Sequence, residues 1–92
     1  MATRKRKPTW EQYARELGIN LLNARMERGL SQERLAHFAG ISSYTYQKFE
    51  KGESRPGAPM NPRLNTLLAL CNVLDVRIED LLPETYPDVL DR

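Results

Sequence analysis

The stretch Ser31–Gly52 constrains the fold more than any other, because it predicts two short helices joined by a tight corner. Ser31 and Ser42 stand where a hydroxyl can accept from the free backbone N–H groups of a first helical turn. Gly40 and Gly52 each follow a helical run, where a residue that tolerates positive φ ends a helix. The sequence therefore predicts one helix from residue 32 to residue 39 and a second over 43–51.

The second of these helices has an unusual outward face. Its inward positions are Tyr46 and Phe49. The rest of the helix offers hydrogen-bonding side chains, namely Ser43, Tyr44, Thr45, Gln47 and Lys48. A helix face exposed to water usually carries many charged residues, because charge is readily hydrated. A face of polar tips suits base edges and phosphates better, so the pattern indicates contact with nucleic acid.

A longer pattern surrounds these two helices. It consists of Arg25, then LSQERLA over 30–36, AGIS over 39–42 and FEKG over 49–52, and it continues into 67–74 and 76–82. In this order and spacing, the chain resembles the Cro/cI repressor type of helix-turn-helix protein, also called the XRE family. The resemblance implies an all-α fold, a five-helix lambda-repressor-like DNA-binding domain. Two departures from the family are an extended first helix and a lengthened loop before the fourth helix.

The resemblance also implies a set of DNA-binding residues. The matching positions are Gln32, Ser42, Ser43, Tyr44, Thr45, Gln47, Lys48 and Arg55. Ser43, Tyr44 and Lys48 fall where the phage repressors of this family touch base edges, and Gln32 matches a phosphate contact. Family members often carry Gln at the base-reading positions, because Gln pairs bidentately with adenine. The set in this chain is different, so base reading is expected but the target sequence does not follow from the resemblance.

Two further residues match a structural ion pair of the family. Arg25 and Glu50 correspond to the pair that ties the first helix to the end of the DNA-reading helix. Tyr46 stands where the family has an aliphatic core residue, so its hydroxyl must reach solvent or a polar partner.

The segment before this unit predicts a long helix over Trp10–Arg28, capped by Thr9. Gly18 lies in its middle, where it can mark a break between a short leading helix and the first helix of the family. Trp10 and Tyr13 precede the usual family start. Either these two rings pack on the domain, or they form part of a dimer surface.

The segment after Gly52 is rich in Pro and Gly and exceeds the family loop by about six residues, which favours a defined loop and not a helix. It is either a neutral insertion or an added contact with the DNA backbone through Arg55. Asn61 then predicts the cap of a helix over 62–74, with a proline at the first helical position. A short last helix is expected over 78–82.

Composition excludes several functional classes. With one histidine and one cysteine, Cys71, the chain offers no internal disulfide, no cysteine-based metal site and no evident catalytic set. The sequence therefore predicts no enzyme activity, no cofactor and no metal. No apolar run approaches the roughly 20 residues that a membrane span needs. The basic start also lacks the apolar segment of a secretion signal, so we expect a cytoplasmic protein.

Charge divides the chain into three expected parts. Residues 1–34 carry eight Lys or Arg and four acidic residues, whereas residues 75–92 carry two and six. We expect a disordered basic arm over 1–8, the helix-turn-helix DNA-binding domain over 9–83 and an acidic tail over 84–92. The arm either follows phosphates and enters a minor groove or remains a solvated tail without contacts.

Two functional hypotheses follow. The first is a sequence-specific transcriptional regulator of the repressor type, a homodimer that reads an inverted repeat in double-stranded DNA through the major groove with helix 43–51. Apolar residues of the C-terminal helices, Val73, Ile78 and Leu82, would supply the dimer surface. The alternative is a helix-turn-helix protein that acts mainly through an unidentified protein partner, such as an antitoxin-like or accessory module.

Overall fold

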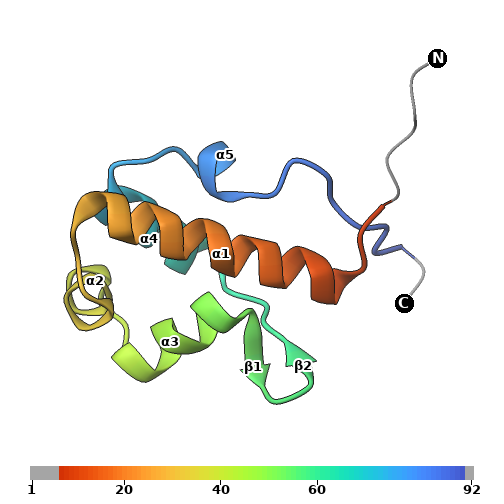
Figure 1. Cartoon of the computed structure of the whole chain (residues 1–92), viewed down its shortest axis with the longest axis horizontal. Helices are drawn as coiled ribbons and strands as arrows, with labels where there is room; N and C mark the ends of the chain where they lie inside the picture. Colours follow the sequence, from red (N-terminus) through yellow and green to blue (C-terminus); the bar gives the residue numbers. More distant parts are fainter. Residues whose placement is uncertain (1–6, 91–92) are drawn as a thin grey trace.

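The computed structural model describes residues 7–90 of the chain. Over that range it contains five helices and one two-stranded antiparallel hairpin (Figure 1). In chain order the elements are α1 (Trp10–Arg28), α2 (Gln32–Ala39), α3 (Ser43–Lys51), β1 (Glu53–Arg55), β2 (Ala58–Pro59), α4 (Leu64–Leu74) and α5 (Ile78–Leu81). The all-α architecture with five helices and an extended first helix is therefore confirmed. Of the expected basic arm, residues 1–6 lie outside the described residues.

Helix α1 contacts α3, α4, α5 and β2, whereas α2 packs on α3 and α4 (Figure 1). The Thr9 hydroxyl accepts from the backbone N–H of Gln12 at 3.1 Å, and the Gln12 side chain accepts from the Thr9 N–H at 2.9 Å. This reciprocal pair is a capping box, which satisfies two backbone donors at the start of the helix. The helix ends at Gly29, whose φ is 71°.

Gly18 does not break α1, so that interpretation of the sequence was wrong. A Cβ atom at Gly18 would lie 2.6 Å from the carbonyl oxygens of both Phe49 and Glu50. The glycine is present because the end of α3 approaches the backbone of α1 too closely for any side chain. Its cost in helix propensity is offset by this close packing of the two helices.

The core draws buried side chains from every helix. They are at most 9% exposed and comprise Ala14, Leu17, Leu21, Leu35, Ala36, Tyr46, Phe49, Met60, Leu67, Leu70, Cys71, Leu74 and Leu81. Tyr46 and Phe49 are therefore the inward positions of α3, as the sequence predicted. Cys71 is a small buried hydrophobe, and burial raises the pKa of its thiol.

The segment between α3 and α4 forms a β-hairpin, which the sequence had not revealed beyond the expectation of a defined loop. The prediction that Asn61 caps α4 was wrong, because the helix begins at Leu64 with Arg63 at the N-cap and no side-chain cap hydrogen bond. Met60 is 1% exposed, and its N–H donates to the Gly52 carbonyl at 2.9 Å. Met60 is thus fixed in the core, and residues 61–63 connect this buried residue to the start of α4.

The C-terminal segment leaves α5 and returns toward the start of α1 (Figure 1). Pro83 and Pro87 are buried along this path. The rings of Trp10 and Tyr13 stack with centroids 5.6 Å apart, and with Pro87 they line an open apolar groove. Among the described helices, none is both long enough and apolar enough to cross a membrane.

Candidate nucleic-acid interface

Local capping fixes the geometry of α2 and α3. The Ser31 hydroxyl accepts from the Arg34 N–H at 3.1 Å, and the Ser42 hydroxyl accepts from the Thr45 N–H at 3.0 Å. Between the helices, Gly40 adopts φ 77°, a left-handed conformation that turns the chain sharply. The two helices therefore begin and end at the residues that the sequence predicted.

The outward face of α3 forms one polar stripe. Tyr44, Gln47, Lys48 and Lys51 recur at i, i+3, i+4 and i+7, so they lie on the same side of the helix. Tyr44 is 67% exposed, Lys51 is exposed, and Gln47 and Lys48 are half-buried. Because Tyr46 and Phe49 hold the opposite side of the helix in the core, this stripe faces outward.

Ser43, Ser42 and Thr45 complete the N-terminal turn of α3. The Ser42 hydroxyl donates to Thr45 Oγ1 at 2.9 Å, so both its donor and one of its acceptor sites are used within the turn. Thr45 keeps its own hydroxyl proton for an outside acceptor. Ser43 is half-buried and makes none of the side-chain hydrogen bonds found within residues 7–90.

Tyr44 and Lys48 lie together on the stripe. The Lys48 ammonium lies 4.2 Å from the centroid of the Tyr44 ring, which is a cation–π contact. The contact orders two long side chains on an exposed face, so less conformational entropy is lost when either of them binds a ligand.

A buried carboxylate joins the three helices that carry this surface. Glu50 accepts from Arg25 Nε at 2.6 Å and Arg25 Nη2 at 3.3 Å, from Gln32 Nε2 at 2.8 Å and from the Tyr46 hydroxyl at 2.5 Å. Arg25 Nη1 also donates to the Leu30 carbonyl at 2.9 Å. The side chains of Arg25 and Glu50 are only 14% and 7% exposed. The donors come from α1, α2 and α3, so one carboxylate fixes the relative orientation of all three helices.

The protonation equilibria of this network follow from its contacts. Burial alone would raise the pKa of Glu50, but hydrogen bonds from Arg25, Tyr46 and Gln32 outweigh burial and hold that pKa below its usual value. Burial and the hydrogen bond to Glu50 raise the pKa of the Tyr46 hydroxyl far above its ordinary value. Glu50 is therefore ionised and Tyr46 neutral over the whole physiological range.

Gln32 has a partner that sequence reasoning missed. Its amide nitrogen donates to Glu50, so the side chain bridges the start of α2 to the end of α3. Two residues 18 positions apart in sequence give no local signal for such a contact. The second N–H of the amide is still able to donate to a phosphate, so the predicted phosphate contact of Gln32 stays a prediction.

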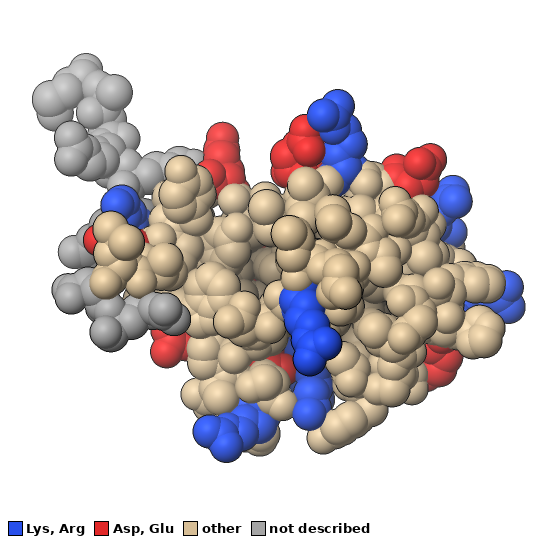
Figure 2. Space-filling view, turned by 180° about the vertical axis from the view of Figure 1, so that it is seen from behind, with Lys and Arg blue, Asp and Glu red and all other residues tan. Residues whose placement is uncertain are grey.

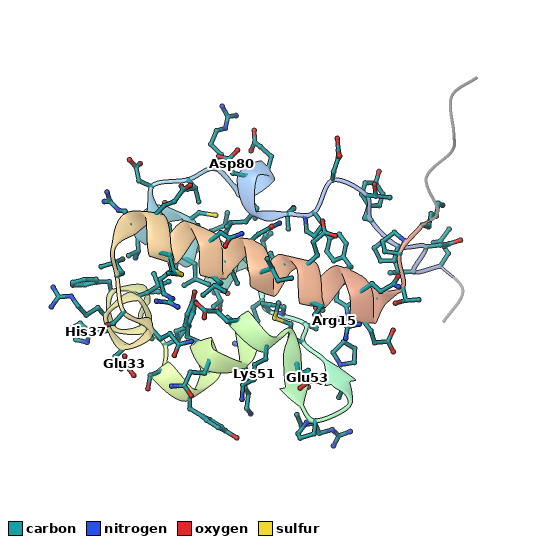
Figure 3. All side chains as sticks on the ribbon, in the orientation of Figure 1. Arg15, Glu33, His37, Lys51, Glu53 and Asp80 are labelled. Carbon is teal, nitrogen blue, oxygen red and sulfur yellow. The ribbon has the colours of Figure 1, made fainter. Side chains whose placement is uncertain are left out.

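Two further basic residues, Lys51 of the stripe and Arg15 of α1, were not among the predicted site residues. Lys51 shares the face of Tyr44 and Lys48, and helical periodicity could have found it. Arg15 and Lys51, with Glu53, line a shallow hollow between α1, the end of α3 and the hairpin (Figure 3). Only tertiary packing brings Arg15 there. Arg55 is exposed in the hairpin, beyond the end of α3.

The surface is uneven in charge. In the space-filling view, basic side chains reach the lower edge of the molecule, and the upper edge, on the side of α5, carries acidic and basic side chains together (Figure 2). Within residues 7–90, no three His, Cys, Asp or Glu side chains come together as ligands for a metal ion. The arrangement offers hydrogen bonds and positive charge to a polyanion.

Comparisons with known proteins agree with this geometry. A family model described as a Cro/C1-type HTH (helix-turn-helix) DNA-binding domain matches residues 20–85. In sequence, the chain is 38% identical over 69 residues to YonR, an HTH-type transcriptional regulator derived from the SPbeta prophage of Bacillus subtilis (strain 168). That alignment covers 75% of this chain and 58% of YonR, so the chain spans little more than half the length of this curated relative.

Two solved structures are similar in fold as well as sequence. The restriction-modification controller protein C.AhdI from Aeromonas hydrophila has a TM-score of 0.66 and 29% identity, over 75% of this chain and 96% of that one. The biofilm regulator SinR, solved in complex with DNA, has a TM-score of 0.61 and 28% identity, over 71% and 95% of the two chains; SinR is from Bacillus subtilis. These relatives are named as regulators and DNA binders, which does not favour the protein-partner alternative.

Proposed function

The chain belongs to the Cro/C1-type helix-turn-helix DNA-binding family of transcriptional regulators, and we propose that it acts as a homodimer that reads an inverted repeat in double-stranded DNA. Helix α3 enters the major groove in this proposal. One observation carries it: Tyr46, Phe49 and Glu50 fix α3 on the core, and the same helix presents its polar stripe outward. The complex of SinR with DNA supports the proposal, since this chain is similar to SinR in both sequence and fold.

The proposed contacts divide into base reading and backbone positioning. Lys48 donates to guanine and Gln47 pairs with adenine, since these side chains match those base edges in the major groove. Tyr44 and Ser43 contact neighbouring bases at the start of the helix. Thr45 uses its remaining hydroxyl proton on a phosphate oxygen.

The remaining backbone contacts come from the ends of the surface. Gln32 and Ser42 lie at the first turns of α2 and α3, where free N–H groups favour an anion. Arg55, the basic residue of the hairpin, contacts the DNA beyond the end of α3, at the backbone or in the groove beside it. We add Lys51 to the proposed set, because it continues the stripe of Tyr44 and Lys48 toward that hairpin.

The proposal includes dimerisation through the C-terminal helices, but it places the centre of the dimer surface at other residues than the sequence suggested. Val73, Ile78 and Leu82 are partly buried against the core and offer less free surface than the sequence suggested. Leu64 and Leu68 on α4 are 65% and 43% exposed. Helix α4 also carries no charged residue, and the interface cores of homodimers are depleted in charge. We therefore centre the dimer surface on the exposed side of α4.

Selection from a randomised duplex library at two salt concentrations tests the DNA-reading proposal. We expect an enriched inverted repeat that survives the higher salt, because base contacts depend less on salt than phosphate contacts do. Lys48→Ala should change the enriched base at its position, whereas Arg77→Ala at the start of α5 should leave the repeat unchanged. Binding without any enriched sequence would contradict base reading by α3.

Light scattering tests the dimer separately. Leu68→Glu places a charge in the proposed interface and should convert a dimer to a monomer whose melting temperature no longer depends on protein concentration, because association stabilises the folded state by mass action. Met26→Glu is the matched control, since Met26 is 65% exposed on α1. A Leu68→Glu variant that remains dimeric would move the interface away from α4.

A further inference from the structure

The β1–β2 hairpin is a fixed projection, because both of its ends are anchored on the core. At one end, Gly52 is buried with φ 78°, and a Cβ atom there would lie 2.7 Å from the Cα of Arg15. At the other end, Met60 is 1% exposed and donates its N–H to the Gly52 carbonyl. The seven residues between these anchors therefore leave and rejoin the domain at one point.

The hairpin lies on the same side of the molecule as the polar stripe of α3. It begins directly after the glycine that ends that helix, and α3 and β1 are in contact. Figure 1 shows that the N-terminal turn of α3 and the turn of the hairpin extend furthest on the side away from α1. Basic side chains reach that edge in Figure 2. A DNA duplex along this edge would meet α3 and the hairpin together.

The turn of the hairpin carries one isolated charge. Arg55 is exposed, and from Ser54 to Asn61 it is the only charged residue. Arg55 takes part in none of the side-chain hydrogen bonds or ion pairs found within residues 7–90. Pro56 and Gly57, whose φ is 80°, hold the turn that follows it. An exposed arginine next to the turn of a hairpin that is anchored at both ends suits insertion into a groove.

We propose that this hairpin is a wing that places Arg55 in the minor groove beside the half-site read by α3, and that it favours A·T base pairs there. The inference rests on the proposed function. Three strand residues extend about 10 Å at roughly 3.3 Å each, which suffices to pass one sugar–phosphate strand beside the major groove. The minor groove is about 6 Å wide and admits an arginine side chain. A·T tracts narrow this groove further and strengthen its negative potential, which attracts arginine.

The test uses the inverted repeat selected above, placed between flanks of A·T pairs only or of G·C pairs only. Binding of fluorescent duplexes by the wild-type protein should be several-fold tighter with the A·T flanks. Arg55→Ala should abolish this flank preference and keep the preference for the repeat over a scrambled duplex. Arg77→Ala, an exposed arginine on the opposite edge, should retain both preferences. Melting temperatures of the variants should match that of the wild type, since both side chains are exposed.

Three other outcomes would contradict the proposal that the hairpin places Arg55 in the minor groove. If Arg55→Ala keeps the flank preference, that preference has another source, such as the N-terminal residues. If Arg55→Ala weakens binding equally on both flanks and lowers the salt slope by about 1, Arg55 contacts a phosphate only. If the wild type shows no flank preference while the repeat is still read, the minor-groove contact is absent and the proposed function stands. Loss of repeat recognition in the wild type would refute the proposed function itself.

Discussion

Replacing Glu50 by alanine should destabilise the protein far more than replacing Glu53 by alanine. Both are glutamates near the end of α3, but only Glu50 accepts from donors of three helices. Glu53 is half-buried beside the hollow with Lys51 and is not among the ion pairs within residues 7–90. The pair of variants therefore isolates the contribution of the buried network.

The magnitude follows from what the substitution leaves behind. Removing one partner of a buried ion pair costs about 3–5 kcal/mol, because the other charge stays buried without compensation. Arg25 retains its hydrogen bond to the Leu30 carbonyl, so we place the loss for Glu50→Ala near the lower end, at about 3 kcal/mol. Glu53→Ala should change stability by no more than about 0.5 kcal/mol.

Thermal unfolding followed by circular dichroism measures this difference. A change of 1 kcal/mol shifts the melting temperature by about 4–8 °C in a domain of this size, so Glu50→Ala should melt at least about 12 °C below the wild type. Equal melting temperatures for the Glu50 and Glu53 variants would refute the dependence of the three helices on one carboxylate.

Acid provides a second readout of the same network. The pKa of Glu50 lies below its usual value in the folded protein, so its contribution is fully present above the unfolded pKa of about 4.3. That contribution is lost as the pH falls through the folded pKa. The stability difference between the wild type and Glu50→Ala should therefore be constant near neutral pH and narrow below about pH 4. A gap that widens in acid would contradict the assigned direction.

Three further substitutions test individual contacts by melting temperature. Gly18→Ala should destabilise despite a gain of about 1 kcal/mol in helix propensity, because the new methyl group would meet two carbonyl oxygens of α3; a more stable variant would contradict this packing. Tyr46→Phe should cost about 1.5 kcal/mol through the lost hydrogen bond to Glu50, and a neutral result would show that the hydroxyl contributes nothing. Asp75→Gly should stabilise by up to about 1 kcal/mol, since Asp75 holds φ 57° at the end of α4; no gain would mean that the left-handed conformation is unstrained there.

The boundaries of α1, α2 and α3 could be predicted because their signals are local. Thr9, Ser31 and Ser42 cap helices through hydrogen bonds that span three residues, and a glycine ends each of the three helices. Periodicity within α3 was sufficient to separate its buried positions from its outward face. Such signals need no knowledge of the rest of the chain.

The features that escaped prediction all depend on contacts between distant segments. The hairpin has strands of three and two residues, too short for a pattern, and is held by the contact between Met60 and Gly52. Gly18 is explained only by the close approach of α3 to the backbone of α1. The predicted Asn61 cap was wrong because Met60 is buried in the core, and the residues after it connect this buried position to α4. In the site, the Gln32 bridge to Glu50 follows from the packing of helices and not from their sequences.

The most direct test of the central claim is to map where a duplex binds on the protein. We would titrate isotope-labelled protein with the selected duplex and record the shifts of its backbone amide resonances by nuclear magnetic resonance. We expect the largest shifts over residues 42–51 and at Arg55, with little change along α5. Shifts centred on α4 or α5, or none near α3, would contradict DNA recognition by the outward face of α3.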